Sequence, residues 1–358
     1  MDSLPATVAS ALAGTGGGTT GWPERRQALT AVAAQLESLL VTDPGPRLVA
    51  VIEQVLTRLA DGVTGGHRHR VDLAELTQRV LDTHARACDR IRPDPVRLAD
   101  WLLDLQLRHP EAPEVGLAGY AGALDDDGLA HYRDRAVALF AALPVIGFGE
   151  TGRYDRARWA LLRVMEELAE YTGDVDLQLM VLSKDLSSGW HYLQVATVLR
   201  DHGRSDEALR WVERGLSAVG GRGAAPRLVD LAVEEHLRRG TPHRAVEVCR
   251  QAFLARPGLE VYLRIRALVV HTDDWPPLRA ELLGHLAREG GHNAVEVYRR
   301  VVEVELARGG PQEQDLLAGW LHQLRGLQPD AFADYLDHIR SRHSADRRLL
   351  DELSRRGF

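Results

Sequence analysis

The chain has 358 residues, enough for two ordinary domains or one repeat array, and 45% of them are hydrophobic against 27% charged. This balance is typical of a globular protein and excludes a disordered one. Two cysteines allow at most one disulfide and exclude a four-cysteine zinc site. The 44 basic and 51 acidic residues give a net charge of −7, which argues against a surface built wholly for a polyanion.

The first 22 residues are expected to form a flexible tail, because 6–21 is rich in small and polar residues. The residues after Met1 lack the basic flank of a secretory signal. The longest uncharged run, between Arg135 and Glu150, is too short to cross a hydrocarbon core of about 30 Å. We therefore expect a cytoplasmic protein without a membrane partner.

Apolar residues at helical spacing predict an N-terminal helical half over 23–146. The first two helices are expected to pair as an antiparallel hairpin. Asp72 and Asp94 precede periodic apolar stretches and are predicted helix N-caps. The expected helices cover, in order, 23–39, 46–59, 72–84, 94–105, 115–123 and 127–143.

The segment 143–153, with the sequence LPVIGFGETGR, concentrates proline and glycine and predicts a joint between two halves. The second half, 153–358, continues the helical pattern. Its first expected helices cover 154–171, 175–186, 189–202 and 205–219.

An internal repeat decides the expected fold class. Residues 189–220 and 226–257 align without a gap at an offset of 37. The matched small residues are Gly203 with Gly240, Ala208 with Ala245 and Gly215 with Ala252, and a weaker third copy contributes Ala280 and Ala287. Small residues at these places allow two helices of a hairpin to lie close together.

This spacing resembles the tetratricopeptide repeat, here in a slightly long and degenerate form. The resemblance implies an all-α fold, a superhelical array of antiparallel helix hairpins in the manner of a tetratricopeptide-like solenoid. Such arrays bury a core by stacking neighbouring hairpins, and their concave face usually binds proteins.

Three longer stretches, 92–107, 173–216 and 253–268, resemble a bacterial helical domain that usually stands C-terminal to SWIM-type zinc fingers. The finger itself needs Cys-x-Cys followed by Cys-x-His, and this chain contains neither pattern. The resemblance therefore covers the helical part alone. It implies no reaction and no cofactor.

No complete catalytic or metal motif is present. His67 with His69, and His84 with Cys88, could each supply two metal ligands but lack partners for the rest. The acidic groups 125–127 and 273–274 stand before expected helices and are interpreted as caps. Glu281 and His285 suit one helix face as a surface pair. We expect no catalytic residues and no metal.

Transferring the groove-facing register of a tetratricopeptide repeat gives a candidate partner-binding face. Its residues combine arginine and carboxylate side chains with a few apolar ones, which suits peptide recognition through charge-assisted hydrogen bonds. An ordinary solvated helix face is the alternative. The candidates are Trp190, Leu193, Thr197, Arg200 and Asp201 in one copy, and Arg227, Asp230, Glu234, Leu237 and Arg238 in the next.

The stretch 182–192, LSKDLSSGWHY, crowds polar and aromatic groups into one turn. Lys184, Asp185 and His191 form a candidate corner site there. The alternative is a structural corner in which Ser187 or Ser188 caps the next helix and Trp190 packs.

The sequence favours a non-catalytic module that binds a protein or peptide in the concave face of the array. One alternative is an enzyme or small-molecule-binding protein with a site at the joint, around 148–158 and 184–191. Another is an accessory subunit that contacts nucleic acid through arginines, which the net charge makes the weakest of the three.

Overall fold

The computed structural model describes residues 3–13, 21–65, 68–152, 155–308 and 311–358. The chain divides into two compact units, Met1–Ser187 and Ser188–Phe358. Apart from one isolated bridge between Ile146 and Asp185, the regular structure within the described ranges is helical. The all-α class predicted from the repeat spacing is confirmed.

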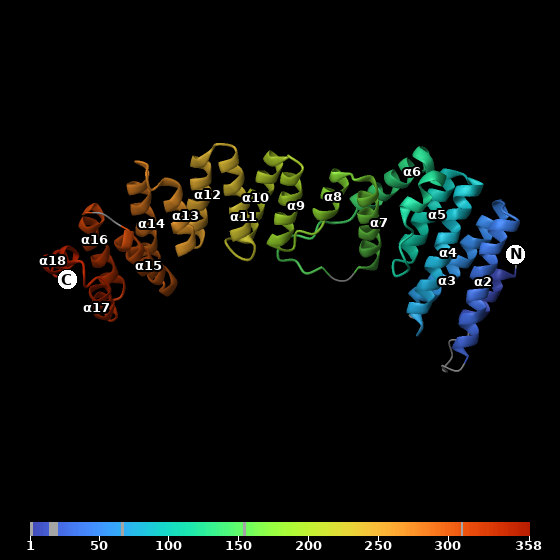
Figure 1. The fold of residues 1–358 in the computed structure, drawn as a ribbon, viewed down its shortest axis with the longest axis horizontal. Helices are drawn as coiled ribbons and strands as arrows, with labels where there is room; N and C mark the ends of the chain where they lie inside the picture. The colour runs from blue at the N-terminus through green and yellow to red at the C-terminus, as the bar shows by residue number, and fades with distance from the viewer. Residues whose placement is uncertain (1–2, 14–20, 66–67, 153–154, 309–310) are drawn as a thin grey trace. The chain divides into compact units, whose positions relative to one another are not determined.

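The first unit contains the helices α1 to α8 and the short 3-10 helix η1 (Figure 1). Their bounds are α1 Leu4–Ala13, α2 Trp22–Thr42, α3 Pro46–Thr64, α4 Arg70–Ile91, α5 Pro95–Arg108, η1 Leu117–Tyr120, α6 Ala121–Ala141, α7 Arg156–Thr172 and α8 Val175–Leu182.

The expected N-terminal tail is wrong over the residues of α1. Leu4, Val8 and Ala11 follow one another at helical spacing and are buried in the core of the first unit. Helix α1 packs on α2 and α3. Alanine and leucine are strong helix formers, so a stretch of small residues can be a packed helix as well as a flexible segment.

Two predicted acidic caps of the first unit are confirmed. The carboxylate of Asp94 accepts a hydrogen bond from the backbone N–H of Arg97 at 2.7 Å, at the start of α5. Asp125 has a φ of 48° inside α6, and its Oδ1 accepts from the N–H groups of Asp127 and Gly128 at 3.0 and 3.2 Å. This carboxylate therefore caps the second part of α6.

The predicted cap at Asp72 is wrong. Helix α4 begins at Arg70, and Asp72 lies inside its first turn. There its Oδ2 accepts a hydrogen bond from the indole Nε1 of Trp22 at 2.9 Å. The carboxylate ties α4 to the start of α2, and a side chain 50 residues away decided its role.

The expected hairpin of α2 with α3 is only a minor contact. Helix α3 packs mainly on α4 and α1, while α2 packs mainly on α1 and α4. Insertion of α1 into the unit explains this, because α1 occupies part of the apolar faces that two helices alone would have turned toward each other.

The second unit contains the helices α9 to α18 (Figure 1). Their bounds are α9 Gly189–Asp201, α10 Ser205–Val219, α11 Ala225–Arg238, α12 Pro242–Ala255, α13 Leu259–Val269, α14 Trp275–Glu289, α15 His292–Arg308, α16 Pro311–Leu327, α17 Phe332–Arg342 and α18 Arg347–Arg355.

The two sequence copies of the repeat form two helix hairpins, α9 with α10 and α11 with α12. Gly203 and Gly240 occupy the turns with φ of 74° and 68°, a left-handed conformation that favours glycine. Ala208 and Ala245 are fully buried where the second helix of each hairpin meets the first. Figure 1 shows the four helices as consecutive neighbours.

The predicted third copy of the repeat is wrong at Ala280, the first of its two small residues. Ala280 is exposed, and the buried side chain in this turn of α14 is Arg279. Arg279 donates to the fully buried carboxylate of Glu305 at 3.1 Å. Glu305 also accepts from the Tyr262 hydroxyl at 3.1 Å and from Arg266 Nε at 2.9 Å. A buried charge network thus replaces the close alanine contact in this part of the unit.

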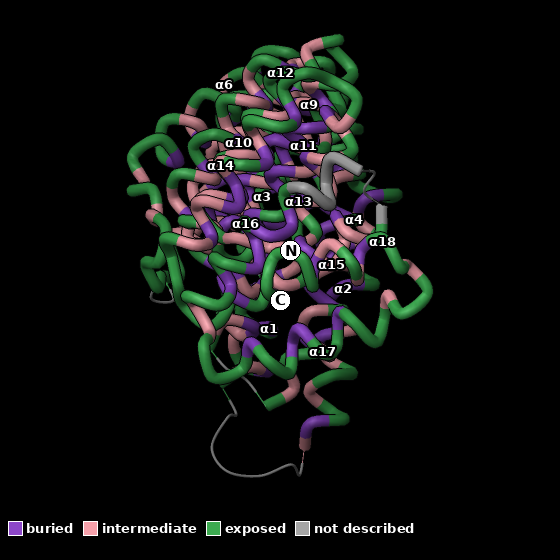
Figure 2. Tube along the Cα trace, turned by 90° about the vertical axis from the view of Figure 1, so that its left-hand side faces the viewer, coloured by how far each residue is buried: buried purple, intermediate pink, exposed green. Residues whose placement is uncertain are grey.

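Each unit has its own hydrophobic core, and buried residues recur along its helices (Figure 2). Cys88 lies in the first core and Cys249 in the second, both as free thiols. Burial raises the pKa of Cys88 to about 12 and that of Cys249 to about 11. Both thiols are therefore packing residues of low reactivity.

The segment 143–153, the expected joint, falls inside the first unit, and the expected domain bounds stay a prediction. Within the described ranges, every helix is either too short or too polar for a bilayer span.

Candidate functional site

The candidate residues on α9 are accessible. The side chain of Trp190 is 57% exposed, and Asp201 is also exposed. Leu193, Thr197 and Arg200 are half-buried on the same helix. An indole in this position does not belong to a hydrophobic core.

Charged candidates from neighbouring hairpins meet each other. Arg200 Nη1 on α9 lies 3.8 Å from Glu234 Oε2 on α11. On the next pair of helices, Asp230 of α11 forms an ion pair with Arg264 of α13. Arg227 Nη1 lies 3.9 Å from Asp230 Oδ2. The structure thus brings the predicted residues of α9 and α11 together, with their charges partly satisfied by one another.

Arg238 is exposed but bonded toward α10. Its guanidinium donates to Glu235 and, at 3.1 Å, to Ser205 Oγ at the start of α10. Glu235 is only 1% exposed and also accepts from Arg239. The hydrogen bonds from Arg238 lower the pKa of Glu235 to about 2, against the opposing effect of burial. Arg238 therefore clamps one hairpin to the next.

Glu235 is not among the residues predicted from the sequence. The signal that could have found it is its spacing of three and four residues from two consecutive arginines, which places all three on one side of α11.

The corner residues mainly hold the chain in place. Lys184 Nζ donates to the carbonyls of Ala141 and Leu143 at 3.1 and 2.6 Å. Asp185 Oδ1 accepts from the backbone N–H of Ser187 at 2.9 Å. Lys184 thus ties the loop after α6 to the segment after α8, and the carboxylate of Asp185 stabilises a turn within that segment.

His191 belongs to the second unit. Its Nδ1 lies 3.4 Å from Ser188 Oγ, the residue that precedes α9. Ser188 makes no side-chain capping bond to a backbone N–H, so the expected cap at this residue is wrong.

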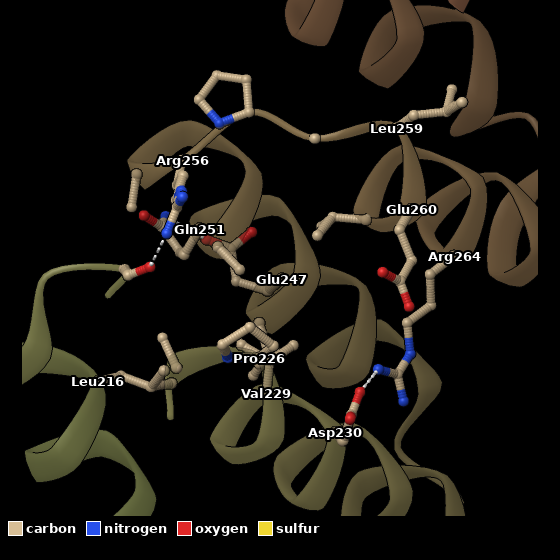
Figure 3. A pocket seen from close by; sticks show the side chains of 18 of the residues that line it. Leu216, Pro226, Val229, Asp230, Glu247, Gln251, Arg256, Leu259, Glu260 and Arg264 are labelled. Atoms are coloured by element: carbon tan, nitrogen blue, oxygen red, sulfur yellow. Dashed lines mark hydrogen bonds and ion pairs between the residues drawn. The ribbon is translucent and has the colours of Figure 1, made fainter. Parts of the chain in front are cut away.

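A pocket of about 1170 Å³ lies over the α11–α12 hairpin, with further walls from α10 and α13 (Figure 3). Leu216, Pro226, Val229 and Ala252 give it apolar surface. Asp230, predicted from the sequence as a partner contact, lines it as well. Its volume exceeds the roughly 300 to 1,000 Å³ that is usual for small-molecule sites.

The charged lining of the pocket is balanced. Asp230 is ion-paired with Arg264, and Glu247 Oε1 lies 3.0 Å from Arg250 Nη1. The lining contains four arginines and four carboxylates, so neither sign of charge is in excess. They are Arg244, Arg256, Arg264 and Arg300, and Glu213, Asp230, Glu247 and Glu260.

The pocket residues on α12 are not among the partner-binding residues predicted from the sequence. They recur every three or four positions, at 244, 247, 248, 251, 252 and 255. The periodicity was visible, but arginine, glutamate and glutamine in half of these positions are equally typical of a solvated face. Only the neighbouring helices make the stripe part of a concave surface.

Within the described ranges, no three His, Cys, Asp or Glu side chains are grouped to hold a metal ion. His84 and Cys88 share a helix face as predicted, with Nε2 3.5 Å from Sγ, but both are fully buried. His84 Nδ1 lies 3.0 Å from the Tyr120 hydroxyl. His67 lies outside the described residues, and the ring of His69 stacks on Trp22 at 4.1 Å.

The remaining acidic candidates lie before a helix or bond to an arginine of another helix. Asp274 precedes α14 without a side-chain capping bond, so the expected cap at this residue is wrong. Glu281 accepts from Arg250 at 3.0 Å through both carboxylate oxygens, which lowers its pKa. His285 also lowers the pKa of Glu281, but its Nε2 is buried without a hydrogen-bond partner among the described residues, so the expected pair is partly buried.

No protein-family model matches the chain, and no curated protein matches its sequence. Among solved structures, it is similar to a circular tandem repeat protein with a novel repeat topology and enhanced subunit contact surfaces. The identity is 14% and the TM-score 0.21, over 99% of this chain and 73% of that one. It is also similar to yeast Tom70, at 10% identity and a TM-score of 0.21, over 99% of this chain and 91% of that one. The all-α fold follows from the helices described above.

Proposed function

We propose that the second unit is an interaction module that binds a protein or peptide partner, with the pocket of α10 to α13 as its centre. The single observation that carries this proposal is the pocket itself. It combines an apolar floor with charges of both signs, supplied by several helices of the unit. Apolar centres with polar rims are typical of protein interfaces.

The face predicted from the sequence supports the same proposal. Asp230 belongs both to that face and to the pocket lining. Trp190 supplies an exposed indole two helices away, and tryptophan is one of the residue types enriched at the energetic centres of interfaces. The partner would then extend from the pocket along α11 toward α9.

The arginines weigh against nucleic acid as the partner. Arg200 and Arg264 both face carboxylates on α11, and the charge of the pocket is balanced. A site for a phosphate backbone needs an excess of positive charge.

Selection of a displayed random dodecapeptide library against the full chain tests the proposal. Enriched peptides are synthesised and titrated in solution. We expect saturable binding of at least one of them to the folded protein. A selection that enriches no peptide able to bind in solution would contradict the proposed function.

A further inference from the structure

We infer that the partner segment in the pocket of α10 to α13 carries an apolar side chain between an acidic and a basic residue. This inference rests on the proposed function and adds the chemistry of the peptide to it. It follows from the apolar side chains at the base of the pocket, from one charged side chain on each side of them, and from the balance of charges in the pocket lining.

The floor of the pocket selects an apolar side chain. Val229 is buried among the helices, while Ala252 and Leu216 are half-buried and Pro226 is exposed. These side chains present apolar surface from α10, α11 and α12 to one space. Removing such surface from water contributes roughly 25 cal/mol per Å², so an aliphatic side chain of the partner is stabilised there.

Two charged side chains lie on opposite sides of this floor (Figure 3). Arg256 donates to the carbonyl of Gly221 at 3.4 Å, which leaves its charge without a carboxylate among the described residues. Glu260, in the first turn of α13, forms no ion pair with another described residue. Both side chains line the pocket. An acidic group of the partner fits Arg256, and a basic group fits Glu260.

Two further carboxylates of the pocket lining are already paired. Asp230 is bonded by Arg264, and Glu247 lies beside Arg250, which also holds Glu281. The pocket as a whole has equal numbers of arginines and carboxylates. A polyanion or a polycation would therefore meet as much repulsion as attraction, whereas a segment with one charge of each sign would not.

The dodecapeptide selection, repeated with charge-reversed variants, tests the inference. Peptides selected on the wild type are expected to carry an acidic and a basic residue on either side of Leu, Ile, Val or Met. Replacing the basic residue of such a peptide by glutamate should weaken binding about tenfold. With the variant Glu260→Arg, the glutamate-substituted peptide should bind better than the original one. The conservative variant Glu260→Gln should remove the preference without inverting it.

Glu289→Arg provides the matched control, because Glu289 is an exposed carboxylate on α14 outside the pocket lining. It should keep the wild-type preference. Peptides that bind without a charge preference, or a preference that survives both Glu260 variants, would overturn the inference and leave the proposed function standing. A selection that yields no binding peptide would overturn both.

Discussion

Arg200 and Glu234 lie 34 residues apart in the chain, yet a guanidinium nitrogen of one is 3.8 Å from a carboxylate oxygen of the other. Asp230 and Arg264 form an ion pair at the same sequence spacing. The first pair joins α9 and α11, the first helices of two neighbouring hairpins, and the second pair joins α11 to α13. In both pairs an arginine connects two helices that are not consecutive in the chain.

The close contact at Gly215 should resist any added side chain. An ideal Cβ at this position would lie 2.8 Å from Tyr192 Cβ and 2.9 Å from Leu228 Cδ1. Overpacking costs about 1 to 3 kcal/mol, which exceeds the gain of about 0.5 to 1 kcal/mol from alanine in a helix. We expect Gly215→Ala to lower the free energy of unfolding, measured by urea denaturation.

Gly319 is the control for that substitution. It lies inside α16 with nothing within 4 Å of an added Cβ. Gly319→Ala should therefore stabilise the protein by about 0.5 to 1 kcal/mol. Equal effects of the two alanines would show that Gly215 is not a packing contact.

The buried carboxylate of Glu305 should be costly to neutralise. It accepts bonds from Tyr262, Arg266 and Arg279, and removing one charge of a buried network leaves the others uncompensated. We expect Glu305→Gln to destabilise the second unit by about 3 kcal/mol or more. Glu296→Gln, at a carboxylate 3.9 Å from Arg299, should change stability by less than about 0.5 kcal/mol. Similar urea midpoints for the two variants would contradict this account.

The stability of the first unit should fall as the pH is lowered below about 6.5. Burial holds the pKa of His84 below its ordinary value of 6.5, although Glu53, 3.7 Å away, opposes this effect. The unfolded chain therefore binds a proton at a pH where the folded chain keeps His84 neutral. The contribution is fully present above the unfolded pKa and is lost as pH falls toward the folded one.

The measurement is urea unfolding of the wild type and His84→Gln across this pH range. Burial also lowers the pKa of His109, which gives a background slope of the same sign in both proteins. The variant should show the smaller dependence on pH. Parallel pH profiles would mean that His84 does not titrate as described.

A fourfold variant tests the face that the sequence predicts, including Asp230, which it shares with the pocket. Replacing Arg200, Asp230, Glu234 and Arg238 together by alanine should weaken the binding of a selected peptide. Arg200 on α9 contacts Glu234 on α11, and Asp230 on α11 contacts Arg264 on α13, so the substitutions change the charges along this face. Arg238→Ala alone should leave binding unchanged and reduce stability, since Arg238 bonds to Glu235 and Ser205. Titration of both variants checks this, and unchanged affinity of the fourfold variant would exclude the face.

Local chemistry made much of the fold predictable from the sequence. Glycines at the two hairpin turns and alanines at their closest contacts follow directly from backbone and packing limits, and so does the cap at Asp94. Asp72 and Ala280 were not predictable in this way. Their roles depend on Trp22 and on Glu305, side chains that only the folded chain brings near.

The candidate site was predictable only in part for the same reason. Register transfer identifies Asp230 and Glu234, because groove-facing positions on the first helices recur with the repeat. The α12 wall of the pocket, including Gln251 and Ala255, consists of side chains that a single helix would expose to solvent. Their concave environment arises from the stacking of three other helices.

Filling the pocket tests the central claim most directly. Ala255 is exposed and lines the pocket, whereas Ala267 is exposed on α13 outside it. The measurement is the fluorescence anisotropy of a labelled, library-selected peptide titrated with wild type, Ala255→Trp and Ala267→Trp. We expect Ala255→Trp to raise the Kd at least about tenfold and Ala267→Trp to change it by less than about twofold. The same Kd for all three proteins would contradict a peptide site in the pocket of α10 to α13.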